Sequence, residues 1–599
     1  PQSILIKQNG FISCLCDANG SAINIELESN YNGAFFSKDD SLNSINIDIR
    51  LERNKFLHCY SEENGGAVTA SYSKYYSLTM LENLEPLNII IHFVKCLFYN
   101  NTAQKQGAGI YLTKLNIKDI NLYGCKFISN KGRYGGGMSI MKISTIAIEG
   151  CHFISNSATR NGGGMSVVNT TVFKQNQTYF MHNKANSRGA ACSFIGTNKS
   201  MGNIQMHSCL FSNNTSKYGA GIYVKKVHVT ALASSIFVNN RAISLGGGIF
   251  ISKCRYVRIM HLEVNSNTAD DDSGGSIYVI STTSFKQIQC HLQNAGNSHF
   301  ESCIFVEIYT SNFISNTDYF IGALCLISIR NIKAANNTYI NNNVKVRGAA
   351  DAFYAWDCTE IFVYLCTFRD HKYGAMTTFD FRRIVILKCI YANNTSGQGT
   401  LYAWTGGSSV IINSIFTFNI NVDHSCGCAQ FRELNYSMFQ NCSFIRNYAK
   451  EISAIILKQI KIVVITGCTF LRNKEKFGKQ YGMVMSYQCN KIGILKSRFV
   501  KNIQSSLYFA EVGTHIIIHN SFFVHNIAKR GGAIQVGTLT FKGANLWCTV
   551  SNSFFLGNSV DLDGGAVTIY QTNTLKLINC RLIKNEAQRS GGSVKFHKV

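Results

Sequence analysis

Proline is nearly absent, since only 2 of the 599 residues are Pro. No Pro-rich, Ser/Gly-rich or charged low-complexity tract divides the chain into linked domains. Acidic residues are also scarce: 33 Asp and Glu stand against 58 Lys and Arg, which gives a formal net charge of +25. No uninterrupted apolar run approaches ~18–20 residues, which excludes a transmembrane helix. A hydrophobic share of 46% excludes a disordered chain.

A repeat of roughly 27 residues organises the sequence. The chain reads GCKFISNKGRYGGGMSI around Phe127 and GCHFISNSATRNGGGMSV around Phe153, and related phrases return along its length. Twenty units are centred on Phe56, Phe98, Phe127, Phe153, Phe180, Phe211, Phe237, Val264, Leu292, Phe313, Tyr339, Phe368, Tyr391, Phe416, Phe444, Phe470, Phe499, Phe523, Phe555 and Leu582.

Each unit contains three short apolar runs, one around C-x-F-x-x-N, one after the glycine cluster and one leading into the next Cys or Ser. The runs are too short for helices, rich in β-branched residues and bounded by Asn and Gly. They predict an all-β fold: a single right-handed parallel β-helix, or β-solenoid, of about 20 coils with three short strands per coil. We expect irregular coils in residues 1–55 and repeat coils in 56–599. Because neither end has an obvious cap, we expect the solenoid to continue beyond one or both ends.

Coils of a solenoid stack about 4.8 Å apart, so equivalent side chains lie on one another. The central aromatic residues are therefore predicted to form an interior stack, and the asparagines three residues later a ladder of amides. These asparagines are also expected to adopt the left-handed turn conformation. The positions that define the two ladders most clearly are Phe127, Phe153, Phe211 and Phe237, and Asn130, Asn156, Asn214 and Asn240.

The paired F-x-x-N and G-G-A/G-I/V/M signatures resemble the repeats of chlamydial polymorphic outer-membrane proteins and of related surface proteins of parasitic protists such as trichomonads. The resemblance extends from about Phe56 to Val594. It implies a right-handed parallel β-helix of the pectin-lyase-like type, used as an ectodomain in adhesion. The strong positive charge departs from the family pattern.

Cysteine recurs two residues before the central aromatic residue. Neighbouring coils bring such Cα atoms about 4.8 Å apart, within the range that a disulfide requires. Serine replaces cysteine at this position in other units, for example at Ser235 and Ser497, which favours buried free thiols that pack as small apolar groups. Both interpretations remain open for the pairs Cys125–Cys151, Cys366–Cys389 and Cys442–Cys468.

Basic residues recur between the turn asparagine and the glycine corner. The predicted stripe consists of Arg133, Arg160, Arg188, Lys217, Arg241, Arg347, Lys372, Lys450, Lys529, Arg530 and Arg589. Such a stripe is either a solvated face or a track for an extended polyanion, such as an acidic glycan or an acidic filament surface. Nucleic acid is disfavoured, because no regular aromatic partner for base stacking and no recognition motif accompany the stripe.

Catalysis on an acidic polysaccharide would need two or three carboxylates that converge in a groove. The candidates are Asp270-Asp271-Asp272, Asp561 with Asp563, and the trio Asp351, Asp357 and Asp370 from successive units. The first two groups precede Gly-Gly pairs, where acids are ordinary turn residues. Cysteine pairs at zinc-site spacing and a nucleophile elbow are missing, so we predict no catalytic residue, no metal and no cofactor.

The sequence therefore predicts a non-catalytic structural or adhesive segment of a cell-surface or extracellular filament protein. We expect its partners to be other protein chains, packed end to end or laterally, and acidic glycans or an acidic filament surface. Two alternatives remain: an intracellular scaffold bound along an acidic cytoskeletal filament, and a polysaccharide lyase or hydrolase.

Overall fold

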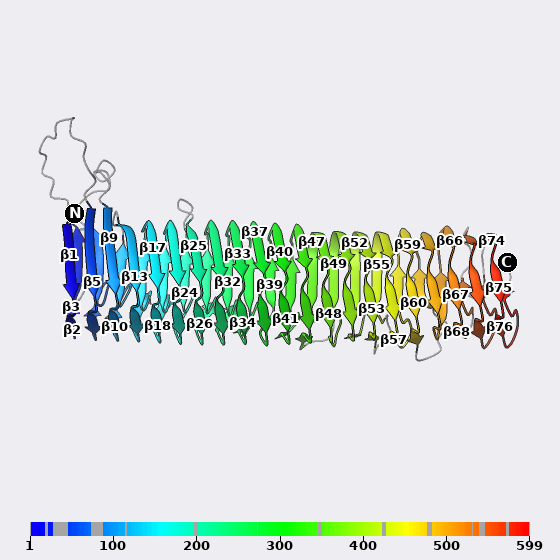
Figure 1. Cartoon of the computed structure of the whole chain (residues 1–599), viewed down its shortest axis with the longest axis horizontal. Coiled ribbons are helices and arrows are strands. Elements are labelled where there is room, and N and C mark those ends of the chain that lie inside the picture. The colour runs from blue at the N-terminus through cyan, green and yellow to red at the C-terminus, as the bar shows by residue number, and fades with distance from the viewer. Residues whose placement is uncertain are drawn as a thin grey trace, which may run out of the picture. The chain divides into compact units, whose positions relative to one another are not determined.

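The computed structural model describes residues 2–17, 22–27, 46–72, 88–113, 117–196, 202–271, 274–345, 350–421, 427–475, 482–529, 531–537, 546–570 and 574–597. The chain forms two compact units, Pro1–Ile304 (unit 1) and Phe305–Val599 (unit 2). All regular elements in these described ranges are β-strands. Within each unit, strands of successive coils lie side by side and pair in parallel (Figure 1). The predicted all-β parallel solenoid is therefore confirmed.

One coil of unit 1 illustrates the local structure. It contains β14 (Lys126–Ile128), β15 (Lys131–Tyr134), β16 (Met138–Met141) and β17 (Thr145–Glu149). The prediction of three strands per coil missed β15, which occupies the corner between the asparagine and the glycines. This corner forms a strand because its backbone pairs with the corner of the next coil, Lys131 opposite Ser157.

The central residues of the repeats, most of them aromatic, lie on short strands, one from each coil. In unit 1 these are β2 (Gly10–Ile12), β6 (Lys55–Leu57), β10 (Leu97–Tyr99), β14, β18 (His152–Ile154), β22 (Tyr179–Met181), β26 (Leu210–Ser212), β30 (Ile236–Val238), β34 (Glu263–Asn265) and β38 (His291–Gln293). In unit 2 they are β41 (Asn312–Ile314), β45 (Thr338–Ile340), β48 (Thr367–Arg369), β50 (Ile390–Ala392), β53 (Ile415–Thr417), β56 (Ser443–Ile445), β60 (Thr469–Leu471), β64 (Arg498–Val500), β67 (Phe522–Val524), β71 (Phe554–Leu556) and β75 (Arg581–Ile583). Each predicted centre is the middle residue of its strand.

The predicted aromatic stack is present in both units. Phe127 and Phe153 are fully buried, with ring centroids 4.6 Å apart and ring planes 1° from parallel. In unit 1 the stack runs from Phe11 to Phe237, and in unit 2 from Phe313 to Phe555. The strands that precede each stack position also place Val, Ile and Leu inward, so the core is a continuous apolar column within each unit.

The asparagine ladder is also present, and its hydrogen bonds connect three coils at a time. The Asn130 side-chain amide donates to the Phe98 carbonyl of the preceding coil at 3.0 Å and to Asn156 Oδ1 of the following coil at 2.9 Å. The Asn130 backbone N–H donates to the same Asn156 oxygen at 3.0 Å. Asn130 and Asn156 are fully buried, so these bonds satisfy polar groups that water cannot reach.

The turn conformation was assigned to the wrong residue. Positive φ occurs one residue before the ladder asparagine, at Ser129 (57°) and Ser155 (55°), for example. The asparagine itself must point inward to reach its neighbours, so the preceding, partly exposed residue makes the turn.

Residues 2–16 form a coil within the segment where irregular coils are expected. Strand β2 pairs in register with β6, and Phe11 stacks on Phe56 with ring centroids 4.9 Å apart. Phe11 was not recognised as a centre, because Cys14 follows it where most units have Asn.

Candidate functional site

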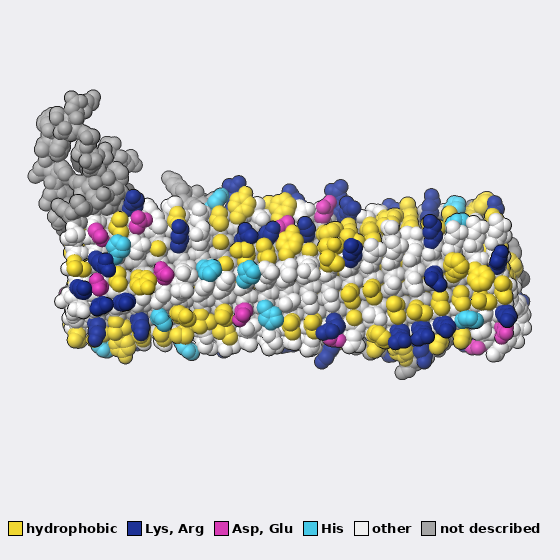
Figure 2. All heavy atoms as spheres, in the orientation of Figure 1, with side chains coloured by type: hydrophobic (Ala, Val, Ile, Leu, Met, Phe, Trp, Pro, Cys, Tyr) yellow, Lys and Arg dark blue, Asp and Glu magenta, His cyan; other side chains and the backbone are white. Residues whose placement is uncertain are grey.

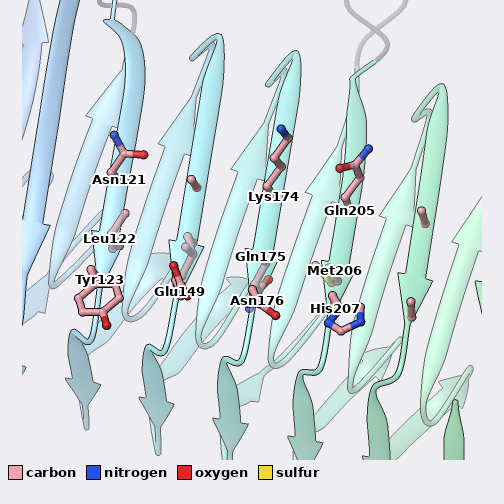
Figure 3. Close-up of a pocket in the computed structure, with 14 residues that line it drawn as sticks. Asn121, Leu122, Tyr123, Glu149, Lys174, Gln175, Asn176, Gln205, Met206 and His207 are labelled. Atoms are coloured by element: carbon pink, nitrogen blue, oxygen red, sulfur yellow. The ribbon is translucent and has the colours of Figure 1, made fainter. Parts of the chain in front are cut away.

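An open groove of about 490 Å³ lies on the outer face of unit 1 (Figure 3). It crosses β13 (Ile117–Tyr123), β17, β21 (Val172–Asn176), β25 (Asn203–His207) and β29 (Val229–Ala233). Strand register aligns one outward row, Tyr123, Glu149, Asn176, His207 and Ala233, and a second row, Asn121, Ala147, Lys174, Gln205 and Ala231. The small side chains of the alanines in these rows leave the open space of the groove, and the longer side chains of the same rows form its borders.

This groove offers polar groups of several kinds but no catalytic pair of acids. Glu149 is the one carboxylate that lines it, and Lys174, His207 and amide side chains line the rest. Figure 3 shows Tyr123 at one end of this row, with Glu149 and Asn176 between it and His207. The groove can hydrogen-bond a polar ligand, whereas hydrolysis by two carboxylates would need a second acid.

The predicted basic stripe does not form a single line in unit 1. Its corner strands are β15, β19 (Ser157–Asn161), β23 (Lys184–Ala185), β27 (Thr215–Tyr218), β31 (Arg241–Leu245) and β35 (Thr268–Ala269). Arg241 is aligned with Thr215, whereas Arg188 is aligned with Asn161 and Tyr218. A register shift between Gly132 and Tyr134 places Arg133 on a bulge. The corner segments differ in length, which displaces their basic residues from one another.

Several stripe residues already contact other side chains. Arg241 makes a two-pronged ion pair with Asp270, with Nε–Oδ1 3.0 Å and Nη2–Oδ2 2.9 Å. Arg589 lies 3.8 Å from a carboxylate oxygen of Asp563. Other guanidinium or ammonium groups lie over tyrosine rings, Arg133 over Tyr134, Arg188 over Tyr223 and Lys217 over Tyr218.

The remaining stripe residues are spread over the corners of both units. Arg160 lies on β19 and is exposed, and Lys372 donates its backbone N–H to Asp351. Lys450 and Lys529 each directly follow a short corner strand of unit 2, β57 (Tyr448–Ala449) and β68 (Ile527–Ala528). Arg347 and Arg530 lie outside the described residues. Contact of this stripe with a polyanion stays a prediction.

The acid trio does not converge. Asp351 lies beside the glycine corner, Asp357 lies at a bend inside β47 (Phe353–Tyr364), and Asp370 directly follows β48. Asp357 accepts a hydrogen bond from the Ser328 hydroxyl at 2.9 Å, and Asp370 pairs with Arg369 at 3.0 Å. Each carboxylate therefore occupies a different corner of its coil and has its own partner.

Asp351 is the acid with the most unusual environment. It is fully buried and accepts hydrogen bonds from the backbone N–H groups of Lys372 and Tyr373, both at 2.6 Å. Burial raises its pKa to about 7, although these two N–H groups favour the charged form.

Two of the other acid candidates, Asp270 and Asp563, have structural partners. Asp270 is held by Arg241, and Asp272 lies outside the described residues. The Ser590 hydroxyl donates to Asp563 at 2.7 Å and, with Arg589, lowers the pKa of that carboxyl. In the described ranges of the chain, no group of three or more His, Cys, Asp or Glu side chains is arranged to hold a metal ion.

The six cysteines considered for disulfides are buried free thiols in the structure. The Cys125 backbone N–H donates to Cys151 Sγ at 3.3 Å, and the Cys442 N–H donates to Cys468 Sγ at 3.4 Å. Serine serves in the same way, since the Cys209 N–H donates to Ser235 Oγ at 3.1 Å. This shared role explains the exchange of Cys and Ser, while the disulfides themselves stay a prediction.

The sequence analysis missed a second set of cations in unit 2. These residues immediately precede ladder asparagines and adopt the turn conformation: Arg446, Arg472, Lys501 and Lys584, with φ between 51° and 53°. All are exposed, and Figure 2 shows Lys and Arg side chains along the lower edge of this region. The signal is present in the sequence as F-x-[K/R]-N in FIRN, FLRN and FVKN, whereas the predicted stripe contains only basic residues that follow the asparagine.

Comparison with known proteins agrees with this architecture. Residues 351–523 match the right-handed β-helix region family, and residues 95–113 and 208–225 match the Chlamydia polymorphic membrane protein repeat. Both short matches run from the end of one apolar strand through the F-x-x-N phrase to the strand after the glycines. Two segments of the chain thus match the polymorphic membrane protein repeat. The predicted resemblance is confirmed there, and both segments lie within the β-solenoid of unit 1.

A curated protein and a solved structure are among the individual matches to the chain. Metabotropic glutamate receptor-like protein R of Dictyostelium discoideum is 22% identical over 388 residues, which are 63% of this chain and 23% of that protein. The chain thus spans about a quarter of that relative's length. A PL6-family alginate lyase, AlyGC, aligns over 99% of this chain and 97% of its own, with 9% identity and a TM-score of 0.25. In the described residues, no helix has the length and apolar character needed to span a membrane.

Proposed function

We propose that the chain is a non-catalytic adhesive or structural segment of a protein exposed at a cell surface or outside the cell. The polymorphic membrane protein repeats and the receptor-like relative support this location. The single observation that carries the proposal is the contrast between the inward and outward residues of the repeated strands.

The inward residues of these strands are nearly constant, whereas the outward residues vary. Phe127, Phe153, Phe180 and Phe211 are stacked inside unit 1, and the residues directly before them are Lys126, His152, Tyr179 and Leu210. Strand register places these four different side chains in one outward row. The constant inward residues keep the coils rigidly stacked, while the variable outward residues can present different contacts along the surface. An adhesive surface needs both properties.

Surface exposure and adhesion test this proposal separately. Antibodies raised against the chain should label intact, unpermeabilised cells that make the whole protein, and beads coated with the chain should adhere to host or neighbour cells. Labelling only after permeabilisation would contradict the surface location. Release of new reducing ends or unsaturated products from alginate, pectate or other acidic polysaccharides would contradict the non-catalytic role.

A second candidate function is a scaffold bound along an acidic filament. The exposed turn cations Arg446, Arg472 and Lys501 of successive coils favour it, together with the net charge of +25. Cosedimentation of the chain with a filament such as F-actin or microtubules should then fall steeply as salt increases. Absence of cosedimentation at low salt would remove this candidate.

A further inference from the structure

Four successive coils near the C-terminal end of unit 2 have an unusual outward pattern. Their sequences are RFVKN (498–502), FFVHN (522–526), FFLGN (554–558) and RLIKN (581–585). Strands β64, β67, β71 and β75 pair in register, so Arg498, Phe522, Phe554 and Arg581 form one outward row. Two aromatic coils therefore lie between two cationic coils.

The aromatic side chains of this row are not part of the core. The next residues, Phe523 and Phe555, supply the buried stack, with ring centroids 4.9 Å apart. Phe522 remains 47% exposed, and its ring centroid lies 6.3 Å from that of Phe554. Phe522 is exposed and Phe554 is half-buried, so the two neighbouring rings present an aromatic surface that a ligand can cover.

These rings border an open groove of about 480 Å³. Val500 and Val524 line it on one side of the rings, and Asn552 and Asn579 line it on the other. No carboxylate is among its lining residues. Figure 2 shows hydrophobic side chains with Lys and Arg on both sides in the region where Figure 1 labels β67. The groove thus combines aromatic, amide and cationic groups.

Each outer coil carries two exposed cations. Arg498 and Lys501 belong to the first coil, and Arg581 and Lys584 to the fourth. Among the ion pairs of the described residues, none includes any of these four side chains. Three coil spacings of about 4.8 Å separate the two cationic coils, so the cation pairs lie roughly 14 Å apart.

We propose that this groove binds an acidic oligosaccharide in which acidic sugars alternate with neutral ones. Neutral sugar rings pack on Phe522 and Phe554, while carboxylate or sulfate groups pair with the cations of the two outer coils. Asn552 and Asn579 supply amide groups for sugar hydroxyls. An oligosaccharide with a negative charge on every sugar would place some of its charges over Phe522 and Phe554. The row of outward residues has no Arg or Lys at these two positions to pair with them.

This proposal names a class of ligand for the proposed adhesive role. It depends on that role only in assuming that the oligosaccharide is displayed on a surface that the chain meets. The probe is a hyaluronan octasaccharide, which alternates glucuronate with N-acetylglucosamine. We expect saturable binding to the purified chain by calorimetry, and no binding of a neutral chitin oligosaccharide of equal length.

The variants F522A/F554A and R498A/R581A test the two halves of the site. Each should weaken hyaluronan binding by about tenfold or more, because each removes two direct contacts. I390A/I415A is the matched control for loss of exposed apolar side chains at the same strand position. R382A/R383A, which replaces two exposed arginines of unit 2 outside the groove and outside the predicted stripe, is the control for loss of two positive charges. Both controls should bind like the parent chain. Thermal unfolding identifies any variant that fails to fold.

The proposal is overturned if hyaluronan does not bind, or if F522A/F554A folds and binds it unchanged. It is equally overturned if polyglutamate binds as tightly and is insensitive to F522A/F554A, since charge alone would then explain the binding. Bead adhesion separates the two proposals. Adhesion by a parent chain that does not bind hyaluronan removes this site and leaves the adhesive role. Hyaluronan binding without adhesion does the reverse.

Discussion

His371 donates its Nδ1–H to the backbone carbonyl of Asn342 at 3.2 Å, at the position where neighbouring coils of unit 2 place asparagine. Its backbone N–H still donates to Asn394 Oδ1 at 3.1 Å, so the following part of the ladder is intact. Its Nε2 atom is buried without a hydrogen-bond partner. The imidazole therefore interrupts the ladder at this coil.

Replacing this histidine should stabilise the chain in acid. Burial lowers the pKa of His371 from 6.5 to about 4, so between these pH values the unfolded chain binds a proton that the folded chain excludes. Stability is retained above pH 6.5 and lost as pH falls toward 4, by on the order of 3 kcal/mol from this group. H371N should remove that loss, measured as the denaturation midpoint of unit 2 from pH 7.5 to 4.

A matched histidine variant provides the control for this pH series. His525 is exposed, so H525N removes one histidine without changing a buried group. The acid sensitivity of H525N should equal that of the parent chain. If H371N loses stability with acid as steeply as the parent chain, the assignment to His371 is wrong.

Asp351 should affect the pH dependence of stability in the opposite direction from His371. Burial raises its pKa from 3.8 to about 7, so between these values the folded chain binds the proton that the unfolded chain releases. This group therefore contributes a loss of stability as pH rises from 4 to 7. D351N keeps an oxygen for the two backbone N–H groups and should be more stable than the parent chain at pH 8, with the difference vanishing near pH 4. A less stable D351N at pH 8 would show that the charged carboxylate is favoured there.

Breaking the ladder should be costly at a single position. Asn156 donates to the Phe127 carbonyl at 2.8 Å and to Asn183 Oδ1 at 3.1 Å, and its oxygen accepts from Asn130. N156A leaves several buried polar groups unsatisfied and should destabilise unit 1 by about 3 kcal/mol or more. Hydrogen exchange of the flanking coils and the urea midpoint measure this loss.

The neighbouring residue supplies the comparison for N156A. Ser155 is exposed, and S155A should change the urea midpoint little. Equal effects of N156A and S155A would contradict the structural importance of the amide ladder.

Thiol labelling should follow burial. Cys14, Cys16 and Cys580 are half-buried, whereas the other described cysteines are buried. Burial raises the pKa of Cys290 and of Cys548 to about 12, which leaves little reactive thiolate at neutral pH. Iodoacetamide should therefore label the three half-buried cysteines first in the native chain, as read by peptide mass spectrometry.

The same reagent tests the predicted disulfides. In denatured but unreduced protein, all 22 cysteines should become alkylated if the ladder consists of thiols. Persistent protection of Cys125 with Cys151, Cys366 with Cys389, or Cys442 with Cys468 would instead demonstrate disulfides and an oxidising compartment.

The sequence by itself determined the repeat and the interior. Residues equivalent to Cys125, Phe127 and Asn130 return in most repeats at the same offsets from one another, because each fills a position that the neighbouring coils must match. This regular spacing can be recognised in the sequence without a structure. The same argument predicted the parallel strands, while the paired F-x-x-N and G-G-A/G-I/V/M signatures carried the resemblance to polymorphic membrane protein repeats.

The tertiary structure alone decided which outward residues meet. Corner segments vary in length, so sequence offsets did not reveal that Arg241 pairs with Asp270 or that Arg188 lies in a different row. The row Arg498, Phe522, Phe554 and Arg581 became visible only through strand register, because no interior constraint repeats its members. Interior side chains pack against and hydrogen-bond to the equivalent side chains of the neighbouring coils, and their pattern is therefore periodic. Outward side chains contact only solvent and ligands, so no such constraint makes their pattern repeat.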